Sequence, residues 1–305
     1  MYSGDYKCFF CAFPSPALTE RTGRMNIKVT SDSTCDLPKE LLEQYSIDLV
    51  PLIVMKEEEE FLDNVTITPN DIFSHVDAGG NLCTTAARSV AVYEELFAKY
   101  AKDYDGMIHI SLGSGFSSSY QNASIAAQGF DNVRVVDSRN LSAGHGLVVL
   151  QACRLAETAQ SLEEIAAQLE EYAGKVETSF VLDRLDYMVK GGRCSMVAAL
   201  GANLLHLKPC IELEEGKMGV GKKYRGKYDK CLASYVKDQL QDREDIDRST
   251  LLLVHTRMDD PACMKAVEEQ IAASGEFGTV YRAVAGCTIS CHCGPNTLGV
   301  IFARK

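Results

Sequence analysis

From residue 25 onward, short runs rich in β-branched residues alternate with longer segments whose apolar residues recur at helical spacing. This alternation constrains the fold strongly, because parallel strands need crossover connections and those connections are usually helices. The predicted strands of the first half are Ile27–Ser31, Leu49–Met55, Met107–Ser111 and Val133–Asp137. The pattern therefore predicts an α/β fold with a parallel, Rossmann-like sheet.

The predicted helices lie between and after these strands. Several open with Ser, or with Pro in the first turn, as helices commonly do. They are Pro38–Gln44, Pro69–His75, Ser89–Tyr104, Ser117–Gly129, Ser142–Ala159 and Ser161–Tyr172. In the last of them, Ser161 and Glu164 have the spacing of a capping box.

The second half has a different pattern. It predicts strands at Val176–Leu182, at Leu251–His255, near Val280 and at Leu298–Ala303. It also predicts helices at Met196–Leu205, Tyr235–Leu240 and Pro261–Ser274, and one hairpin at Pro209–Lys230. A chain of 305 residues is about twice the usual domain length. We therefore expect two α/β domains, residues 25–175 and 176–305. Residues 1–24 have no sustained period, so we expect them to be an extension and Met25 to be the native start.

The balance of charges argues against one large class of function. The chain has 42 acidic and 31 basic residues, a formal net charge of −11, and such a surface repels nucleic acid. It has no apolar run of 18 residues and no charged segment followed by an apolar core at its start. We therefore expect no membrane insertion and no signal peptide, and we expect the protein to be cytoplasmic. Its twelve cysteines are then expected to be reduced thiols.

Small hydroxyl residues follow three of the predicted strands. The clusters are Thr30–Thr34 with Ser31, Asp32 and Ser33, then Cys83–Thr85, and then Ser111–Ser119. Ligands of parallel sheets lie beyond the carboxyl ends of the strands, where helix N-termini favour anions. Each cluster alone is explained by helix capping. Three of them together indicate a shared pocket for a carboxylate or phosphate.

A second group of candidate residues lies near the C-terminus, at a predicted strand-to-turn junction. Cys287, Cys291, His292 and Cys293 are all possible metal ligands. On a strand, however, Cys291 and Cys293 would share one face while His292 points to the other. We therefore predict no metal site here. The Cys8-x-x-Cys11 pair has no second cysteine pair nearby, so it is also weak evidence for a metal site.

Two further motifs fall short of the chemistry they suggest. The segment Gly216–Lys223 begins like a phosphate-binding loop but carries Lys223 where magnesium binding needs Ser or Thr, so the chain has no credible ATP site of its own. The serine-rich loop lacks the Gly-x-Ser-x-Gly of a nucleophile elbow. A distinct feature is the basic segment 217–230, which is either a docking surface for an acidic partner or a solvated hairpin.

These pieces occur in an order that resembles the DegV family, from about Asn26 to Phe302. The matching motifs are Val29–Thr34, Asp36-Leu37-Pro38, the threonine-rich loop before Ser89, Ser111–Gln121, Val136-Asp137-Ser138, Leu185–Ser195 with Gly191-Gly192-Arg193, Lys208-Pro209, and His292-Cys293-Gly294-Pro295 with Gly299. The chain departs from the family at Arg88, where a proline is common, and at Gly113 and Ser118, where serine and glycine are common. These departures leave open which loop serine is used.

The resemblance implies a protein that holds a long-chain fatty acid in a buried tunnel, with no other cofactor. The residues implied at the carboxylate are Thr85, Ser114, Ser117, Ser118, Arg193 and His292, with Ser31, Asp32, Ser33, Gly115 and Gly294 in support. The resemblance also implies a binding subunit rather than an enzyme. A separate fatty acid kinase would phosphorylate the carboxylate for phospholipid synthesis, with Arg193 and a protonated His292 balancing the added charge.

The basic hairpin is our candidate for docking that kinase, through Lys222, Lys223 and Arg225. Two other functions stay open. One is a serine-dependent hydrolase or acyltransferase that uses Ser114 or Ser117 with His292. The other is a metal or redox protein built on Cys287, Cys291 and Cys293. We expect Cys83, Cys194, Cys291 and Cys293, which flank the motifs, to be small buried fillers of a lipid pocket.

Overall fold

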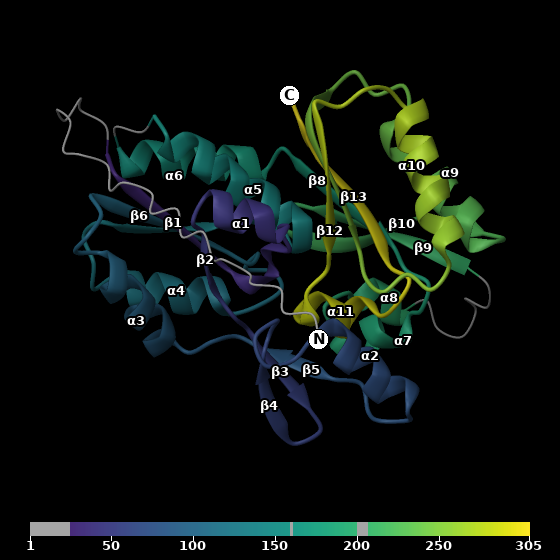
Figure 1. Ribbon diagram of the computed structural model, residues 1–305, viewed down its shortest axis with the longest axis horizontal. Coiled ribbons are helices and arrows are strands. Elements are labelled where there is room, and N and C mark those ends of the chain that lie inside the picture. The colour runs from purple at the N-terminus through teal and green to yellow at the C-terminus, as the bar shows by residue number, and fades with distance from the viewer. Residues whose placement is uncertain (1–24, 159–160, 200–206) are drawn as a thin grey trace, which may run out of the picture.

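The computed structural model describes residues 25–158, 161–199 and 207–305. Two large sheets lie side by side, one built from the first half of the chain and the other from the second, and a small third sheet lies below them in Figure 1. The predictions made for residues 1–24 and for the end of the helix Met196–Leu205 lie outside the described residues.

The first large sheet is parallel, as the sequence predicts. Its order is β2-β1-β6-β7, with β1 (Ile27–Asp32), β2 (Asp48–Val50), β6 (Gly106–Ser111) and β7 (Val133–Asp137). Helices cover both faces (Figure 1): α1 (Lys39–Gln44), α5 (Ser142–Ala156) and α6 (Leu162–Ala173) on one, α3 (Val90–Tyr100) and α4 (Ser119–Ala127) on the other. The strand order reverses between β1 and β6, and their carboxyl ends are where such sheets bind ligands.

The second large sheet is mixed, with the order β10-β9-β8-β13-β11-β12. Only β11 and β12 run parallel. Its strands are β8 (Val176–Val181), β9 (Leu207–Glu214), β10 (Lys217–Arg225), β11 (Ile246–His255), β12 (Thr279–Val284) and β13 (Leu298–Arg304). The predicted hairpin is therefore confirmed as β9 and β10.

Alternate residues of this second sheet belong to two separate cores. Leu251 and Leu253 of β11 pack beneath α9 (Tyr228–Leu240) and α10 (Pro261–Ala273), whereas Leu252 and Val254 join the core that contains α5. This is the period-2 burial of a sheet covered on both faces. Because α5 also packs against β1 and β6, one helix lies between the two large sheets. The domain boundary near residue 175 remains a prediction, although the change of sheet falls between β7 and β8.

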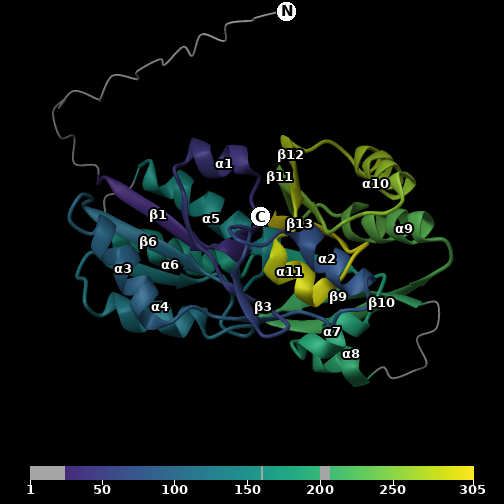
Figure 2. The ribbon, with the colours of Figure 1, turned by 60° about the horizontal axis from the view of Figure 1, so that its bottom comes forward.

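The remaining elements surround a short helix near the C-terminus, α11 (Cys287–Cys293). They are the antiparallel sheet β4-β3-β5, with β3 (Ile53–Lys56), β4 (Glu59–Leu62) and β5 (Thr84–Ala86), and the helices α2 (Pro69–Asp77), α7 (Asp186–Gly191) and α8 (Ser195–Ala199). Both views place α11 beside α2 and α7 (Figures 1 and 2). The end of the chain thus packs against elements from its first third.

Three local predictions are wrong. The run Leu49–Met55 is not one strand but two, β2 and β3, in different sheets, because Pro51 offers no N–H for a continuous ladder. The helix predicted from Tyr235 begins already at Tyr228. His292 lies in α11 rather than at a strand end, so the argument that Cys291 and Cys293 share one strand face does not apply.

The ten cysteines of the described ranges are all buried free thiols. They are distributed through the hydrophobic clusters rather than paired, in agreement with the expected role as small fillers. Cys8 and Cys11 lie outside these ranges. Nowhere in the described segments is a helix both long and apolar enough to traverse a lipid bilayer.

Candidate functional site

A cavity of about 50 Å³ lies where the loop after β6, strand β5, helix α7 and helix α11 meet. Its polar lining includes Thr85, Ser117, Arg193 and His292. The rest is mainly apolar, with Leu52, Leu112, Phe116, Leu141, Met188, Met218 and Ile289. The cavity thus combines hydroxyl groups and a cation at one side with a hydrocarbon wall at the other.

A second cavity, of about 20 Å³, adjoins the first. The two share Leu141, Ile289 and Cys293 in their walls. The second cavity is also lined by Phe180, Val254 and Ile301 of the mixed sheet. Apolar residues of the mixed sheet therefore lie next to the wall of the first cavity.

Thr85 and His292 are joined by the central contact of the mouth. Thr85 lies opposite Val54 in the β3–β5 pairing, and its Oγ1 is 2.7 Å from His292 Nε2. The other ring nitrogen, Nδ1, is buried and has no hydrogen-bond partner among the described residues. A buried N–H without an acceptor is rarer than an unpaired lone pair, so we assign the proton to Nε2, which donates to Thr85. The hydroxyl hydrogen of Thr85 is then free to point into the cavity.

His292 is neutral at neutral pH. Burial, and to a smaller extent the charge of Arg193, lowers the pKa of His292 to about 4. The expectation that a protonated His292 balances ligand charge does not agree with this environment. The positive charge at the mouth comes instead from Arg193.

Arg193 is held at the exposed mouth by the turn that follows α7. Its Nη1 donates to the carbonyl oxygen of Gly191 at 2.7 Å, and its Nε lies 3.5 Å from the carbonyl oxygen of Phe116. Gly191 also packs against the histidine, because a Cβ at this position would lie 2.2 Å from His292 Nδ1. Only glycine fits at position 191, and Gly192 has a φ of +68°, which explains the two glycines of the motif.

Of the three candidate loop serines, the structure brings only Ser117 to the cavity. Its Oγ accepts a hydrogen bond from the backbone N–H of Ser119 at 3.2 Å. The hydroxyl of Ser114 instead donates to Asp137 Oδ2 at 2.5 Å, and Ser118 is exposed at the start of α4. Neither Ser114 nor Ser118 lines the cavity, so we do not include them in the site.

Two glycines expected to support the site lie close to it. A Cβ on Gly115 would lie 2.4 Å from the carbonyl oxygen of Gly216, so this residue lets the serine loop touch the tip of the β9–β10 hairpin. Gly294 follows the last residue of α11 with a φ of +74°. Both therefore shape the backbone around the mouth.

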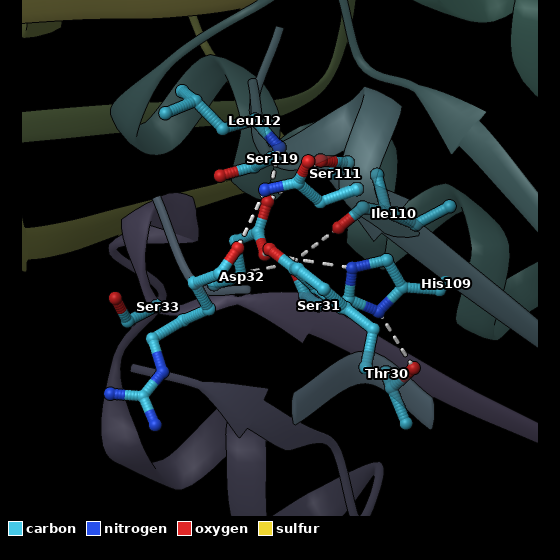
Figure 3. A network of polar contacts seen from close by, with 12 residues as sticks. Thr30, Ser31, Asp32, Ser33, His109, Ile110, Ser111, Leu112 and Ser119 are labelled. Carbon is cyan, nitrogen blue, oxygen red and sulfur yellow. Dashed lines mark hydrogen bonds and ion pairs between the residues drawn. The ribbon is translucent and has the colours of Figure 1, made fainter. Parts of the chain in front are cut away.

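Asp32 is the centre of a buried polar network at the ends of β1 and β6 (Figure 3). It accepts hydrogen bonds from Tyr93 at 2.7 Å and from Ser111 Oγ and the Leu112 N–H at 2.8 Å each. His109 Nε2 lies 3.6 Å from its Oδ1. Burial opposes ionisation, but the contact with His109, the charge of His145 and the Leu112 N–H hold the pKa of Asp32 below its usual value. Asp32 thus fixes the start of the serine loop from behind the cavity.

The other two residues of this cluster anchor neighbouring elements. Ser31 Oγ lies 2.9 Å from Nε2 of His145 on α5, and burial lowers the pKa of His145 to about 4. Ser33 donates to Asp63 Oδ2 at 2.8 Å. Ser31, Asp32 and Ser33 therefore lie behind the cavity rather than in its wall.

Two buried acidic side chains hold the N-terminus of α11, and the sequence analysis missed this role. Asp63 accepts hydrogen bonds from the Cys287 N–H at 2.8 Å and from Thr288 Oγ1 at 2.7 Å. Asp36 accepts one from the Gly286 N–H at 2.9 Å. A helix N-terminus favours such acceptors. Asp36 belongs to the matching motif Asp36-Leu37-Pro38, but no local signal shows that it reaches residue 286.

The apolar lining of the cavity was also missed. Phe116, Met188 and Met218 come from the serine loop, α7 and β10, and each occupies an ordinary apolar position in its own segment. Only the packing of these three segments shows that they share one wall. No sequence signal within any one segment distinguishes them from other core residues.

The geometry does not favour a serine-dependent hydrolase or a metal site. Ser117 Oγ is engaged with Ser119 and Ser114 with Asp137, and His292 Nε2 contacts Thr85, so the described residues contain no serine–histidine pair at the mouth. Across the described ranges, no three His, Cys, Asp or Glu side chains are arranged to hold a metal ion.

The basic hairpin is less uniform than its sequence suggests. In the antiparallel register Lys217 faces Glu214, and Gly219 faces Glu212, so acidic residues of β9 offset the charge near the tip. Lys222 Nζ forms an ion pair with Asp238 Oδ2 at 2.6 Å. Lys223 and Arg225, at the far end of β10, are exposed. The basic surface is therefore concentrated at that end of the strand.

Comparisons with known proteins agree with this architecture. A family model described as an uncharacterised protein of the DegV family matches residues 26–305. A DegV domain-containing protein of Clostridium acetobutylicum is 33% identical over 283 residues, which cover 92% of this chain and 99% of that protein. A DegV family protein from Thermus thermophilus, described for its fatty acid binding, has a TM-score of 0.82 at 28% identity, over 92% of this chain and 100% of that one. DegV of Bacillus subtilis, described as a fatty acid binding protein, has a TM-score of 0.78 at 29% identity, with coverage of 92% and 100%.

Proposed function

The chain belongs to the DegV family, and on this premise we propose that it binds a long-chain fatty acid. The carboxylate lies at the mouth formed by Thr85, Ser117 and Arg193, and the acyl chain extends into the two adjoining cavities. The observation that carries the proposal is a cavity with hydroxyl groups and Arg193 in its wall, which shares Leu141, Ile289 and Cys293 with an apolar neighbour. The two solved relatives described as fatty acid binders support it.

Hydrophobic burial supplies the affinity. Roughly fifteen methylenes at about 0.8 kcal/mol each give a gross gain of about 12 kcal/mol, which the entropy of ordering chain and protein reduces. The cavities, at about 50 and 20 Å³, are narrow compared with ligand pockets of roughly 300–1,000 Å³. Binding must therefore move side chains apart. Met188 and Met218 suit this role, because methionine is flexible and adapts to irregular space.

The mouth provides orientation. With Thr85 accepting from His292, its own hydroxyl donates to the carboxylate, and Arg193 adds a charge at the exposed end. Neutral His292 therefore acts as a positioning residue that fixes the direction of the Thr85 hydroxyl.

Mass spectrometry of the purified protein tests this function. Protein expressed in a bacterial host and then denatured in organic solvent should release a long-chain fatty acid in about equimolar amount. Delipidated protein should regain such a ligand from added fatty acid. Ligand-free protein that also takes up no fatty acid would overturn the proposal.

We further propose that the protein is a binding subunit and presents the carboxylate to a separate ATP-dependent fatty acid kinase in the cytoplasm. Two features support this. The segment Gly216–Lys223, which resembles a phosphate-binding loop in sequence, lies in an antiparallel hairpin rather than between a strand and a helix. The strand β10 carries Met218 in the cavity wall and, further along, the exposed Lys223 and Arg225. A partner docked on its far end is thus connected to the mouth through a single strand, whose pairing with β9 shifts register between Val220 and Lys223.

Charge reversal separates docking from lipid binding. The double variant Lys223→Glu/Arg225→Glu should keep fatty acid affinity but lose most acyl phosphate formation in an assay with purified kinase subunit and ATP. Lys265→Glu, on the exposed side of α10, is the matched control. It should leave fatty acid affinity and acyl phosphate formation unchanged. Full acyl phosphate formation by the double variant would refute docking at this surface.

A further inference from the structure

A third cavity, of about 1110 Å³, lies where the β9–β10 hairpin departs from β8. One wall is formed by Val176–Ser179 of β8, and the other by Glu212–Gly216 with Gly219 and Val220 of the hairpin. We call this cavity the β8–β9 cleft. It shares no lining residue with the cavity at the mouth, so a ligand bound here would not occupy the proposed fatty acid site.

The cleft exists because β8 and β9 pair over only part of their length. Ser179–Val181 of β8 pairs with Cys210–Glu212 of β9. Val176–Thr178 pairs with β13 on its other side, and Leu213 and Glu214 pair with β10. Among the described strands, these two segments do not pair with each other. The edge of β8 at residues 176–178 is therefore open to the cleft.

This open edge belongs to buried residues whose backbone groups face the cleft. The Leu182 N–H donates to the Pro209 carbonyl oxygen at 3.2 Å, so Leu182 directs its backbone groups toward β9. Successive residues of a strand alternate sides, so Thr178 and Val176 direct theirs the same way. These two residues are only 3% and 7% exposed. Because buried backbone groups need hydrogen-bond partners, the edge is suited to receive another strand.

On one face of the sheet, the walls of the cleft are apolar. Val176, Leu213 and Val220 all pack with the hydrophobic core that contains α5. Side chains alternate between the two faces along a strand, so every second side chain of an added strand would lie beside these residues. Aliphatic side chains suit this face, because they exclude water from it.

On the other face, the walls of the cleft are acidic. Glu212 and Glu214 lie on the same face of β9 and are exposed. Glu177 of β8 is already paired with Arg243 and Arg304, whereas Glu212 and Glu214 form no ion pair with a described residue. The remaining side chains of an added strand would lie beside these two carboxylates, which basic groups complement.

We propose that the β8–β9 cleft binds an extended segment of a partner protein in which basic and aliphatic residues alternate. The segment pairs as an antiparallel strand with the edge of β8 at Val176–Thr178, in the manner of peptides that extend a sheet. Its aliphatic side chains lie beside Leu213 and Val220, and its basic side chains lie beside Glu212 and Glu214. The charge of the cleft favours such a segment, since four glutamates in its lining outnumber two arginines.

A synthetic peptide of about nine residues, in which lysine and valine alternate, tests the pairing. Its fluorescent form should bind saturably to full-length protein, with or without fatty acid, and the glutamate–valine peptide should bind about tenfold more weakly. In an antiparallel strand, the residues opposite Thr178 and Val176 share their apolar face, so the valine N–H groups point toward β8. N-methylation of the valines should therefore abolish binding, whereas N-methylation of the lysines should leave most of it. Equal affinities of the three lysine–valine peptides would overturn the proposal.

A pair of double variants tests the position. Glu212→Gln/Glu214→Gln should weaken binding of the lysine–valine peptide by about tenfold. Glu94→Gln/Glu95→Gln, which removes the same charge from exposed positions on α3, is the matched control and should bind the peptide normally. Equal affinities for the two double variants would place the peptide elsewhere and overturn the proposal.

Hydrogen exchange gives a backbone readout that needs no substitution. Saturating lysine–valine peptide should slow exchange of the Val176 and Thr178 amides in the wild type. Delipidated and fatty-acid-loaded protein should show the same protection, because the cleft and the mouth have separate linings. Unchanged exchange at residues 176–178 would exclude strand addition to β8, whether or not the protein binds fatty acid.

Discussion

Thr85 and His292 show how single side chains give the candidate site its chemistry. They lie 207 positions apart in the chain and meet at 2.7 Å. The histidine is buried against Gly191 and is neutral, so it contributes no charge. Its contribution is to direct the threonine hydroxyl, while Arg193 supplies the positive field at the mouth.

The substitution Thr85→Val should weaken fatty acid binding by about tenfold to a hundredfold. It keeps the branched shape that suits a strand but removes the donor to the carboxylate, a hydrogen bond to a charged group worth about 1.5–3 kcal/mol. Displacement of a fluorescent fatty acid measures the effect. The neighbouring Thr84→Val, at an exposed position, is the control and should bind normally. Equal affinities for the two variants would exclude Thr85 from the carboxylate site.

The neutral His292 should make stability depend on acidity. Its pKa is about 4 when folded, against about 6.5 when unfolded, so between these values the unfolded chain binds more protons. The wild type should therefore lose stability relative to His292→Gln as the pH falls from about 6.5 to about 4, by on the order of 2 kcal/mol. Urea titrations at both ends of this range measure the difference. A difference that does not vary with pH would show that His292 titrates normally.

At the scale of elements, α11 connects the two ends of the chain. It is only seven residues long, too short to be stable alone, and its N-terminal groups are bound by two aspartic acid side chains from the first third of the sequence. Its other end carries His292 to β5. The position of the mouth therefore depends on two acidic residues that do not line the cavity.

Asp63→Asn tests this dependence. Asp63 is 1% exposed and accepts hydrogen bonds from Ser33, Cys287 and Thr288, which one amide oxygen cannot serve equally. We expect a loss of about 1–3 kcal/mol in the free energy of unfolding. Asp77→Asn, which removes an exposed ion pair with Arg257, should cost at most about 1 kcal/mol. If both variants lose a similar free energy of unfolding, the Asp63 hydrogen bonds stabilise the protein no more than an exposed ion pair does.

At the scale of the whole molecule, the two proposed domains share α5. Its residues Leu147 and Val148 belong to one core with Ile108 of the parallel sheet and Ile301 of the mixed sheet. The boundary near residue 175 then separates two sheets but not two independent cores. The proposed acyl chain would lie between the same sheets, where it adds contacts to both.

Calorimetry should accordingly show one unfolding transition for the full chain, because neither sheet can lose its packing on α5 without exposing the core of the other. Added fatty acid should raise the midpoint of that single transition, as any ligand of the native state does. Two resolved transitions, of which fatty acid shifts only one, would contradict the shared core and favour independent domains.

The type and order of most elements could be predicted from the sequence. β1, β6, β7 and the β9–β10 hairpin were predicted because alternation of apolar residues and turn chemistry act locally. The break at Pro51 was missed, although a proline that cannot donate to a ladder is a local signal. The helix at Cys287–Cys293 was missed because the local pattern there agrees with strand and with helix, and only the neighbours in space decide between them.

The sequence by itself determined the parallel sheet, the hydroxyl clusters at its strand ends, and the residues Thr85, Ser117, Arg193 and His292 as candidates. The tertiary structure alone decided that Ser117 rather than Ser114 faces the cavity, and that Asp36 and Asp63 hold α11. The physical reason is the sequence separation over which each kind of interaction acts. Backbone preference and burial period act over a few residues, whereas a cavity is formed by side chains more than 200 positions apart, whose contacts exist only once the chain has packed.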